Sequence, residues 1–343
     1  MKPYLISRDG ARPEDLVGRV LCHQVPGPEG KVLLKKGHIL QQDDIPLLLA
    51  CPWQELHLLE LEAGDLTEGE AGERLAHAVA GDGVHSKAAA HGKHTLVAAH
   101  RGVLKVDVAA LHRVNGLPGI AVYTLFTDQV ISRADVVAHA QIAPLTVPRR
   151  TIETVEEIAC SSGGLLRVLP FAPRVVAVLV REWMDVAARQ RFLASFTMKL
   201  HWFGCEIRDV VELPDDPHAV TKAVEACIRS GVTLLLLAGG NAMDPLDPFF
   251  LALEAAGARL ERHGMPAHPG TLLWLASLGG TPVIGLPACG LFSQATVFDL
   301  LLPKLLAQGS ISEEDVAALG HGGILNRDMA FRFPPYEKKD AAP

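Results

Sequence analysis

The sequence predicts an α/β fold for the second half of the chain. Two apolar runs, residues 174–180 and 232–238, have the length and unbroken hydrophobicity of strands buried on both faces of a sheet. Stretches with helical spacing follow these runs, and glycines that can end helices come after several of them. Strands that alternate with helices are typical of parallel βαβ units. We therefore expect a mostly parallel sheet with helices on both faces.

The elements expected in this half follow one another in a regular order. Gly231 and Gly257 come directly after two helix-like stretches, where a left-handed C-terminal residue is favoured. The expected elements are strands at 174–180, 206–212, 232–238 and 281–286, and helices at 186–203, 217–230, 248–256 and 294–307.

The first half of the sequence predicts shorter strands and helices. Strand-like stretches are expected at 16–25, 31–40 and 53–61, helices at 44–49, 71–79 and 151–159, and a loop at 88–94. We expect a small β-rich segment at 1–62, a mixed α/β region at 63–169, an α/β domain at 170–325 and a tail at 326–343.

Composition excludes several classes of protein. The formal net charge of −7 disfavours a nucleic-acid-binding surface, which needs a basic face. No apolar run approaches the roughly 20 residues of a membrane span, and the first residues lack the apolar core of a signal peptide. The six cysteines are scattered without C-x-x-C pairs, which indicates reduced thiols. We expect a cytoplasmic protein that binds neither nucleic acid nor membrane.

The first candidate site follows the apolar run at 232–238. Gly239 and Gly240 would let a ligand approach the backbone, and ligands of open parallel sheets bind beyond the carboxyl ends of the strands. Asp247 precedes Pro248 at a helix start, so it is also suited to cap that helix. The alternative is that Asp244 and Asp247 only form turns and caps.

The second candidate site lies within residues 264–290. Pro269 and Gly270 form a turn, and Gly279-Gly280 can connect two strands as a hairpin. A Gly-rich segment then leaves a strand, and we expect it to enter a helix whose free N–H groups suit a phosphate. The alternative is a plain strand-to-helix connection. The residues of this segment are Gly285, Leu286, Pro287, Ala288, Cys289 and Gly290.

Together these motifs resemble the molybdenum-cofactor biosynthesis domain that molybdopterin adenylyltransferases and molybdotransferases share. The resemblance covers about residues 173–325, and a weaker likeness of the upstream part is to the extra domains of the molybdotransferases. It rests on residues 213–216, 238–240 with Asp247, 269–270, 282–287 and 296–306. It implies a three-layer α/β/α domain with a mostly parallel sheet, preceded by mixed α+β N-terminal domains.

The resemblance also implies a site. Asp247, with Asp244, would hold Mg²⁺ and act in catalysis. The pterin phosphate would be bound by Gly239, Gly240, Asn241, Pro269, Gly270, Gly285, Pro287, Ala288, Cys289 and Gly290.

The sequence departs from the family pattern where catalysis is concerned. The family's first strand usually ends in T-G-[DS]-E, and residues 181–184 lack that glycine. The inner serine and later glycine of the second loop are Ala242 and Asp244. The two lysines beside the Pro-Gly turn, which would attract phosphate, are His268 and Thr271.

Three functions therefore remain open. The first is metal-assisted insertion of molybdate into adenylylated molybdopterin. The second is a non-catalytic carrier or scaffold that holds molybdopterin or the molybdenum cofactor for a molybdoenzyme. The third is a nucleotide pyrophosphatase or deamidase with a related domain. The related families are often oligomers, so we expect a homo-oligomer that binds a pterin.

Overall fold

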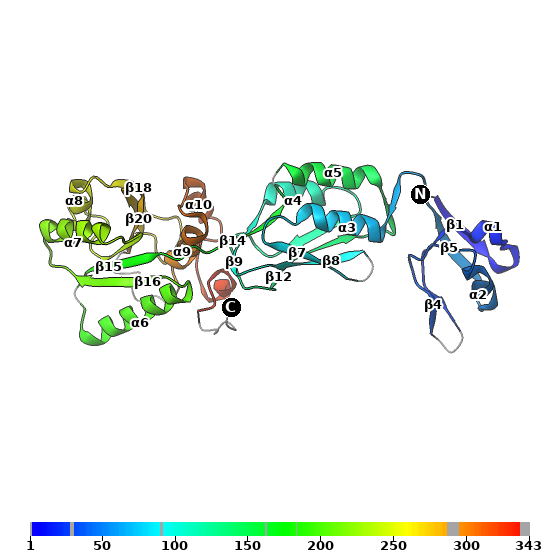
Figure 1. Ribbon diagram of the computed structural model, residues 1–343, viewed down its shortest axis with the longest axis horizontal. Helices are drawn as coiled ribbons and strands as arrows, with labels where there is room; N and C mark the ends of the chain where they lie inside the picture. Colours follow the sequence, from blue (N-terminus) through cyan, green and yellow to red (C-terminus); the bar gives the residue numbers. More distant parts are fainter. Residues whose placement is uncertain are drawn as a thin grey trace. The chain divides into compact units, whose positions relative to one another are not determined.

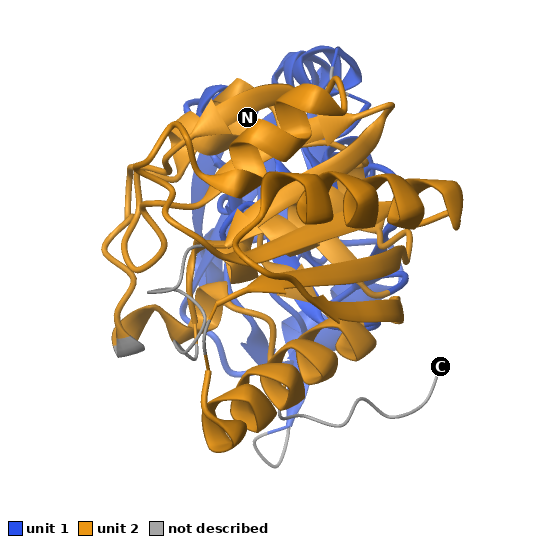
Figure 2. Ribbon diagram, turned by 90° about the vertical axis from the view of Figure 1, so that its left-hand side faces the viewer, with its two compact units in different colours: residues 1–100, 104–127, 133–168 blue, residues 101–103, 128–132, 169–343 orange. Residues whose placement is uncertain are grey.

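A computed structural model describes residues 2–27, 31–89, 92–161, 163–182, 184–286 and 295–336. The chain forms two compact units (Figures 1 and 2). Unit 1 consists of residues 1–100, 104–127 and 133–168, and unit 2 of residues 101–103, 128–132 and 169–343. Each unit has its own strands and helices, so the mixed α/β character of the chain is confirmed.

Unit 1 contains two main sheets. The first has the strand order β1-β5-β2 and encloses a separate apolar core that includes Trp53 and Leu56. The second has the order β10-β12-β8-β7. Helix α3 of this unit begins with a capping box between Thr67 and Glu70. The elements are β1 (Lys2–Ser7), α1 (Pro13–Leu16), β2 (Val20–Leu21), β3 (Val25–Pro26), β4 (Val32–Leu34), α2 (Asp44–Ala50), β5 (Glu55–Glu60), β6 (Asp65–Thr67), α3 (Glu68–Val79), β7 (Val84–Ala88), β8 (Lys93–Ala98), α4 (Val108–Asn115), β10 (Ile120–Thr124), β12 (Val136–Ile142), β13 (Thr146–Pro148) and α5 (Arg149–Cys160).

Unit 2 is built on a six-stranded sheet with the order β16-β15-β17-β20-β19-β18. The four strands from β16 to β20 are parallel, whereas β19 and β18 are antiparallel to their neighbours. Its elements are β15 (Val175–Arg181), α6 (Val186–Trp202), β16 (Glu206–Glu212), α7 (Pro217–Arg229), β17 (Leu234–Gly239), α8 (Pro248–Ala255), β18 (Arg259–His263), β19 (Trp274–Leu278), β20 (Thr281–Leu286), α9 (Val297–Gln308), α10 (Glu313–Ala318) and a 3-10 helix at Arg327–Arg332.

Alternate residues of the central strands face two different apolar cores. In β15, Val176 and Val178 pack with residues of α6 and α9, while Ala177 and Leu179 pack with residues of α7 and α8. Helix α6 accordingly lies on the opposite side of the sheet from α7 and α8 (Figure 1). Strands β15 and β17 are apolar on both faces because helices cover both.

A buried ion pair joins α6 to α9 within the first of these cores. The Lys199 ammonium lies 2.8 Å from Oδ1 of Asp299, and both side chains are nearly inaccessible to solvent. Burial, and next the Asp299 carboxylate, raises the pKa of Tyr336 well above its ordinary value. The phenol therefore stays protonated and donates to Oδ1 of Asp299 at 2.8 Å. The remaining Asp299 oxygen accepts the N–H of Thr296 at 2.8 Å, so this buried carboxylate is fully paired.

Two short segments from the middle of the sequence belong to unit 2. Arg101 stacks on Trp202 with its guanidinium carbon 3.4 Å from the ring centroid, and donates to the Trp202 carbonyl at 2.6 Å. Asp128 lies 2.8 Å from the ammonium of the buried Lys304. Residues 101 and 176 positions apart in sequence thus complete the same unit.

The structure differs from the expected elements in several places. The expected strand at 16–25 is divided, because Gly18 adopts a left-handed φ of 80° and turns the chain after α1. The expected loop at 88–94 is shorter, since β7 and β8 pair up to Ala88 and His94. The last long helix begins at Val297, where Thr296 and Asp299 form a capping box, rather than at 294. Strand β18 was not expected, because all five of its residues are exposed and carry no apolar alternation.

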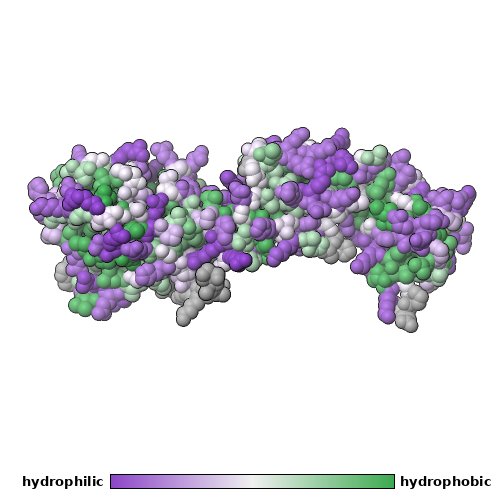
Figure 3. Space-filling view, in the orientation of Figure 1, coloured by the Kyte–Doolittle hydropathy of each residue, from purple (hydrophilic) through white to green (hydrophobic). Residues whose placement is uncertain are grey.

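The surface carries a mixture of residue types. Hydrophilic and hydrophobic residues are interspersed over the visible face of the chain (Figure 3). Within the described residues, no helix combines the length and the apolarity that crossing a bilayer requires.

We predict that Asp299→Ala lowers the free energy of unfolding of unit 2 by about 3–5 kcal/mol, because it leaves the Lys199 ammonium buried without its partner. Urea unfolding followed by tryptophan fluorescence measures the change. Glu225→Ala, which removes an exposed partner of Arg229 in α7, is the control, with an expected cost below about 1 kcal/mol. Equal losses for the two variants would contradict a stabilising role of the buried pair.

Candidate functional site

The candidate residues gather where the parallel strands of unit 2 end. Arg181 at the end of β15 is in register with Gly239 at the end of β17, and Ala238 is in register with Leu286 at the end of β20. Neighbouring strands lie about 4.8 Å apart, so the two Gly-rich strand ends share one edge of the sheet. This is the edge at which ligands of open parallel sheets bind.

The Asp247 carboxylate organises the loop between β17 and α8. Its Oδ1 accepts the N–H of Phe249 at 2.9 Å, which caps α8. Its Oδ2 accepts the N–H of Asn241 at 2.7 Å and a hydrogen bond from the guanidinium of Arg181. Only 5% of the side chain is exposed, so this carboxylate is buried but fully paired.

Arg181, the last residue of β15, connects the loops that follow β16 and β17. One terminal nitrogen of its guanidinium pairs with Asp247 and the other with Asp215, in the turn after β16. The guanidinium carbon lies 5.0 Å from the centroid of the Phe249 ring, within the range of a cation–π contact. The Arg181 side chain is 10% exposed, whereas that of Asp215 is 79% exposed.

The glycine pair makes room for this arginine. Gly239 and Gly240 have φ angles of 92° and 77°, which side-chain-bearing residues rarely adopt. A Cβ on Gly240 would lie 2.7 Å from a terminal nitrogen of Arg181, and one on Gly239 would lie 2.6 Å from the Arg181 carbonyl oxygen. Both glycines are therefore explained by contacts within the protein, and their predicted role in pterin binding remains a prediction.

The N–H groups of this loop are largely used in hydrogen bonds within the protein. Those of Gly240 and Asp244 donate to backbone carbonyls, and that of Met243 donates to the Asn241 side chain. The Asp244 carboxylate accepts the N–H of Leu246 at 2.9 Å in a local turn. The alternative reading of the sequence, in which Asp244 and Asp247 form turns and caps, describes these contacts.

The site does not fit a divalent metal ion. Asp247 is already bound by a guanidinium and two N–H groups, and Asp244 accepts the N–H of Leu246 in its own turn. Across the described ranges, no group of three or more His, Cys, Asp or Glu side chains converges on one point. Magnesium prefers several oxygen ligands in octahedral geometry, which these residues do not supply.

The Pro-Gly turn lies at the start of α9. The N–H of Val297 donates to the Pro269 carbonyl at 3.1 Å, and a Cβ on Gly270 would lie 2.9 Å from that of Val297. The predicted residues Pro287, Ala288, Cys289 and Gly290 lie outside the described residues. Leu286 at the end of β20 is in register with Ala238, and Val297 at the start of α9 contacts Pro269.

Gly285 has a packing role that the sequence did not reveal. It pairs with Trp274 across the antiparallel strands β19 and β20, and a Cβ at this position would lie 1.8 Å from an atom of the indole ring. Position 285 must therefore be glycine to leave room for Trp274, with or without a ligand.

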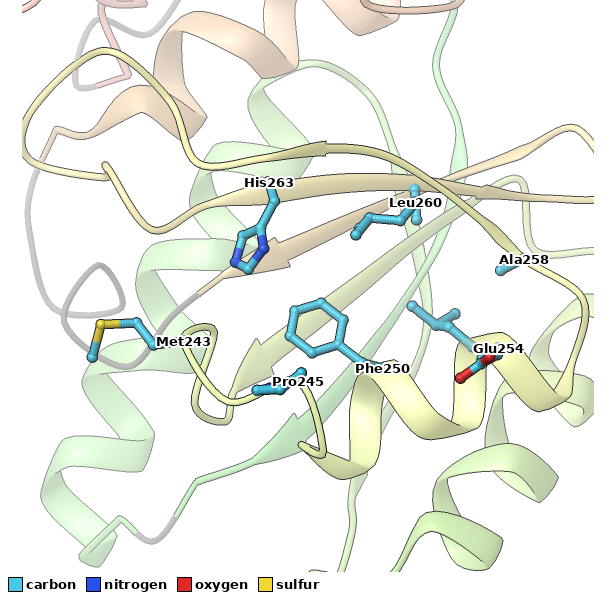
Figure 4. A pocket seen from close by; sticks show the side chains of 9 residues that line it. Met243, Pro245, Phe250, Glu254, Ala258, Leu260 and His263 are labelled. Atoms are coloured by element: carbon cyan, nitrogen blue, oxygen red, sulfur yellow. The ribbon is translucent and has the colours of Figure 1, made fainter.

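A hollow of about 350 Å³ adjoins the same loop (Figure 4). It lies between α8 and the edge strand β18, and none of the predicted site residues lines it. The His263 ring contacts the carbonyl of Ala242 at 2.5 Å and so joins β18 to the loop. The hollow is mostly apolar and is lined by Met243, Pro245, Phe250, Leu253, Glu254, Ala258, Leu260, His263 and Ala276.

Sequence reasoning missed Arg181 and Asp215 as members of the site. Arg181 lies in the segment 181–184, for which only the missing glycine was noted, and Asp215 lies in the segment 213–216, which was noted only for its likeness to the family pattern. The available signal was a cationic residue at the end of a buried strand, where an acidic side chain from a neighbouring loop is needed as its partner.

The chain has partial matches among known proteins. A family model described as a domain of unknown function (DUF8806) matches residues 12–60. A molybdopterin molybdenumtransferase of Synechococcus elongatus is 33% identical over 78 residues, which is 23% of this chain and 19% of that protein. The match thus spans about a fifth of the relative's length. The resemblance to proteins of molybdenum cofactor biosynthesis is confirmed.

Solved structures with related names also match the chain. The molybdopterin biosynthesis Mog protein from Mycobacterium ulcerans is 15% identical with a TM-score of 0.31, covering 40% of this chain and 99% of that one. The molybdopterin biosynthesis moeA protein from Pyrococcus horikoshii is 11% identical with a TM-score of 0.27, covering 90% of this chain and 74% of that one.

We predict that Asp247→Ala lowers the free energy of unfolding by about 3 kcal/mol, because it removes a helix cap and a buried partner of Arg181. Asp215→Ala removes the exposed partner and should cost less than about 1 kcal/mol. Thermal and urea unfolding of both variants measure the difference. A larger loss for Asp215→Ala than for Asp247→Ala would contradict the assignment of Asp247 as the organising carboxylate.

Proposed function

We propose that this protein binds molybdopterin, or the molybdenum cofactor, at the strand-end edge of unit 2 and holds it without hydrolysing its adenylylated form. The supporting observation is that the motifs shared with the molybdenum-cofactor domain come from distant parts of the sequence to one edge. The Gly239 loop lies beside the end of β20, and the Pro-Gly turn comes shortly before β19, whose first residue Trp274 pairs with Gly285 near that end of β20.

The contacts of Asp247 favour binding over metal-assisted insertion of molybdate. Insertion in the form that the resemblance implies needs a metal held by Asp247 and Asp244. Asp247 instead caps α8 and pairs with Arg181, and Asp244 accepts a local N–H group. A carrier or scaffold needs no such metal. The same proposal includes that the protein forms a homo-oligomer and that a molybdoenzyme receives the cofactor from it.

The ligand can be identified directly. The full chain, purified from cells that make molybdopterin in molybdate-containing medium, is examined by native mass spectrometry. The expected result is a bound mass equal to molybdopterin or its metal-loaded form, and the same spectrum reports the oligomeric state. With adenylylated molybdopterin and Mg²⁺, we expect binding without release of AMP. Absence of pterin both after purification and after titration would remove the proposal, and rapid AMP release would restore the insertion reading.

We predict that Met243→Glu weakens molybdopterin binding about tenfold. Met243 is 73% exposed on the loop after β17, so a glutamate there is tolerated by the fold but repels an anionic phosphate. Met198→Glu, on an exposed position of α6, adds the same charge elsewhere and should leave the affinity unchanged. Fluorescence titration measures both. Equal affinities for the two variants would place the ligand away from this loop.

A further inference from the structure

The candidate site contains a positive charge that belongs to the protein. Arg181 is in contact with the two acidic groups, Asp215 and Asp247, that converge on the strand-end edge. Its side chain is nine-tenths buried, and the Phe249 ring and Gly240 enclose it. A guanidinium stays protonated at any ordinary pH and donates up to five hydrogen bonds in fixed directions. It can therefore pair with two carboxylates at once.

We propose that Arg181 takes the place of a divalent cation at this site and makes the site independent of metal. The two carboxylates flank the guanidinium from the turn after β16 and the loop after β17, as they would flank an oxygen-binding metal ion. The close approach of Gly240 shows that the loop is shaped around the arginine side chain. The inference concerns only the cation of the site, so it holds or fails independently of whether molybdopterin is the ligand.

The replacement has a chemical consequence. A metal ion can lower the pKa of a bound water molecule and present it as a nucleophile, and it can offer open positions to phosphate oxygens. A guanidinium has no open coordination position that could activate a water molecule, and two of its N–H groups are already engaged by carboxylates. Arg181 thus sets the class of chemistry at this edge, which is retention of a ligand rather than hydrolysis of a phosphoanhydride.

The test is to measure Mn²⁺ binding by electron paramagnetic resonance and by the Mn²⁺-dependent shift in melting temperature. Wild type should show neither binding nor shift at this site. Arg181→Ala leaves a gap between two carboxylates, so it should gain Mn²⁺ binding and a melting temperature that rises with Mn²⁺. Arg181→Ala combined with Asp215→Asn should lose at least tenfold of the gained affinity.

Two controls separate this effect from the loss of any arginine. Arg181→Lys keeps a cation in the gap and should gain no Mn²⁺ binding. Arg229→Ala removes an arginine of an exposed pair in α7 and should behave as wild type. Should Arg181→Ala not fold, Arg181→Gln, which loses the charge but keeps most of the volume, takes its place.

Two results would overturn the proposal. The first is Mn²⁺ binding by wild type that Asp247→Asn abolishes, because the metal would then coexist with Arg181. The second is a folded Arg181→Ala or Arg181→Gln that binds no more Mn²⁺ than wild type, because the arginine would then not occupy a cation position.

Discussion

The strand-end edge of unit 2 depends on the hydrogen bonds of a single carboxylate. Asp247 has two oxygens, and each fixes a different part of the local structure: Oδ1 the start of α8, and Oδ2 both the turn at Asn241 and the Arg181 guanidinium. Because the carboxylate is buried, leaving any of these partners unpaired would be costly. The conformation of the loop, the position of the arginine and the need for glycine at 240 therefore follow from one group.

This arrangement alters the meaning of a familiar pattern. A strand that ends in two glycines, followed by an acidic turn and a helix, suggests a backbone opened for a phosphate. Here the negative charge at the start of α8 is the protein's own carboxylate, and the positive charge opposite it is the protein's own guanidinium. The pattern preserves the geometry of the edge, while its charges are satisfied internally.

Much of the sheet in unit 2 could be predicted from the sequence, because unbroken apolar runs such as 234–238 have few other possible environments. Capping residues such as Asp247 could also be predicted, since the cap is a local interaction. The partners of Arg181 could not, because Asp215 and Asp247 lie 34 and 66 residues away in sequence. The sequence predicted only a ligand-binding role for Gly285. Its packing role could not be predicted, because only the pairing of β19 with β20 reveals that Trp274 occupies the space of a side chain at this position.

The composition of unit 2 bears on how such a domain can be inherited. Its sheet and helices come from residues after 168, yet Arg101 covers Trp202 and Asp128 neutralises Lys304. A gene fragment that began at residue 169 would encode the whole sheet but would leave a buried ammonium short of one anion and an indole face uncovered. Recombination at that boundary is therefore penalised. We therefore expect the two units to be inherited together and not to be exchanged separately between proteins.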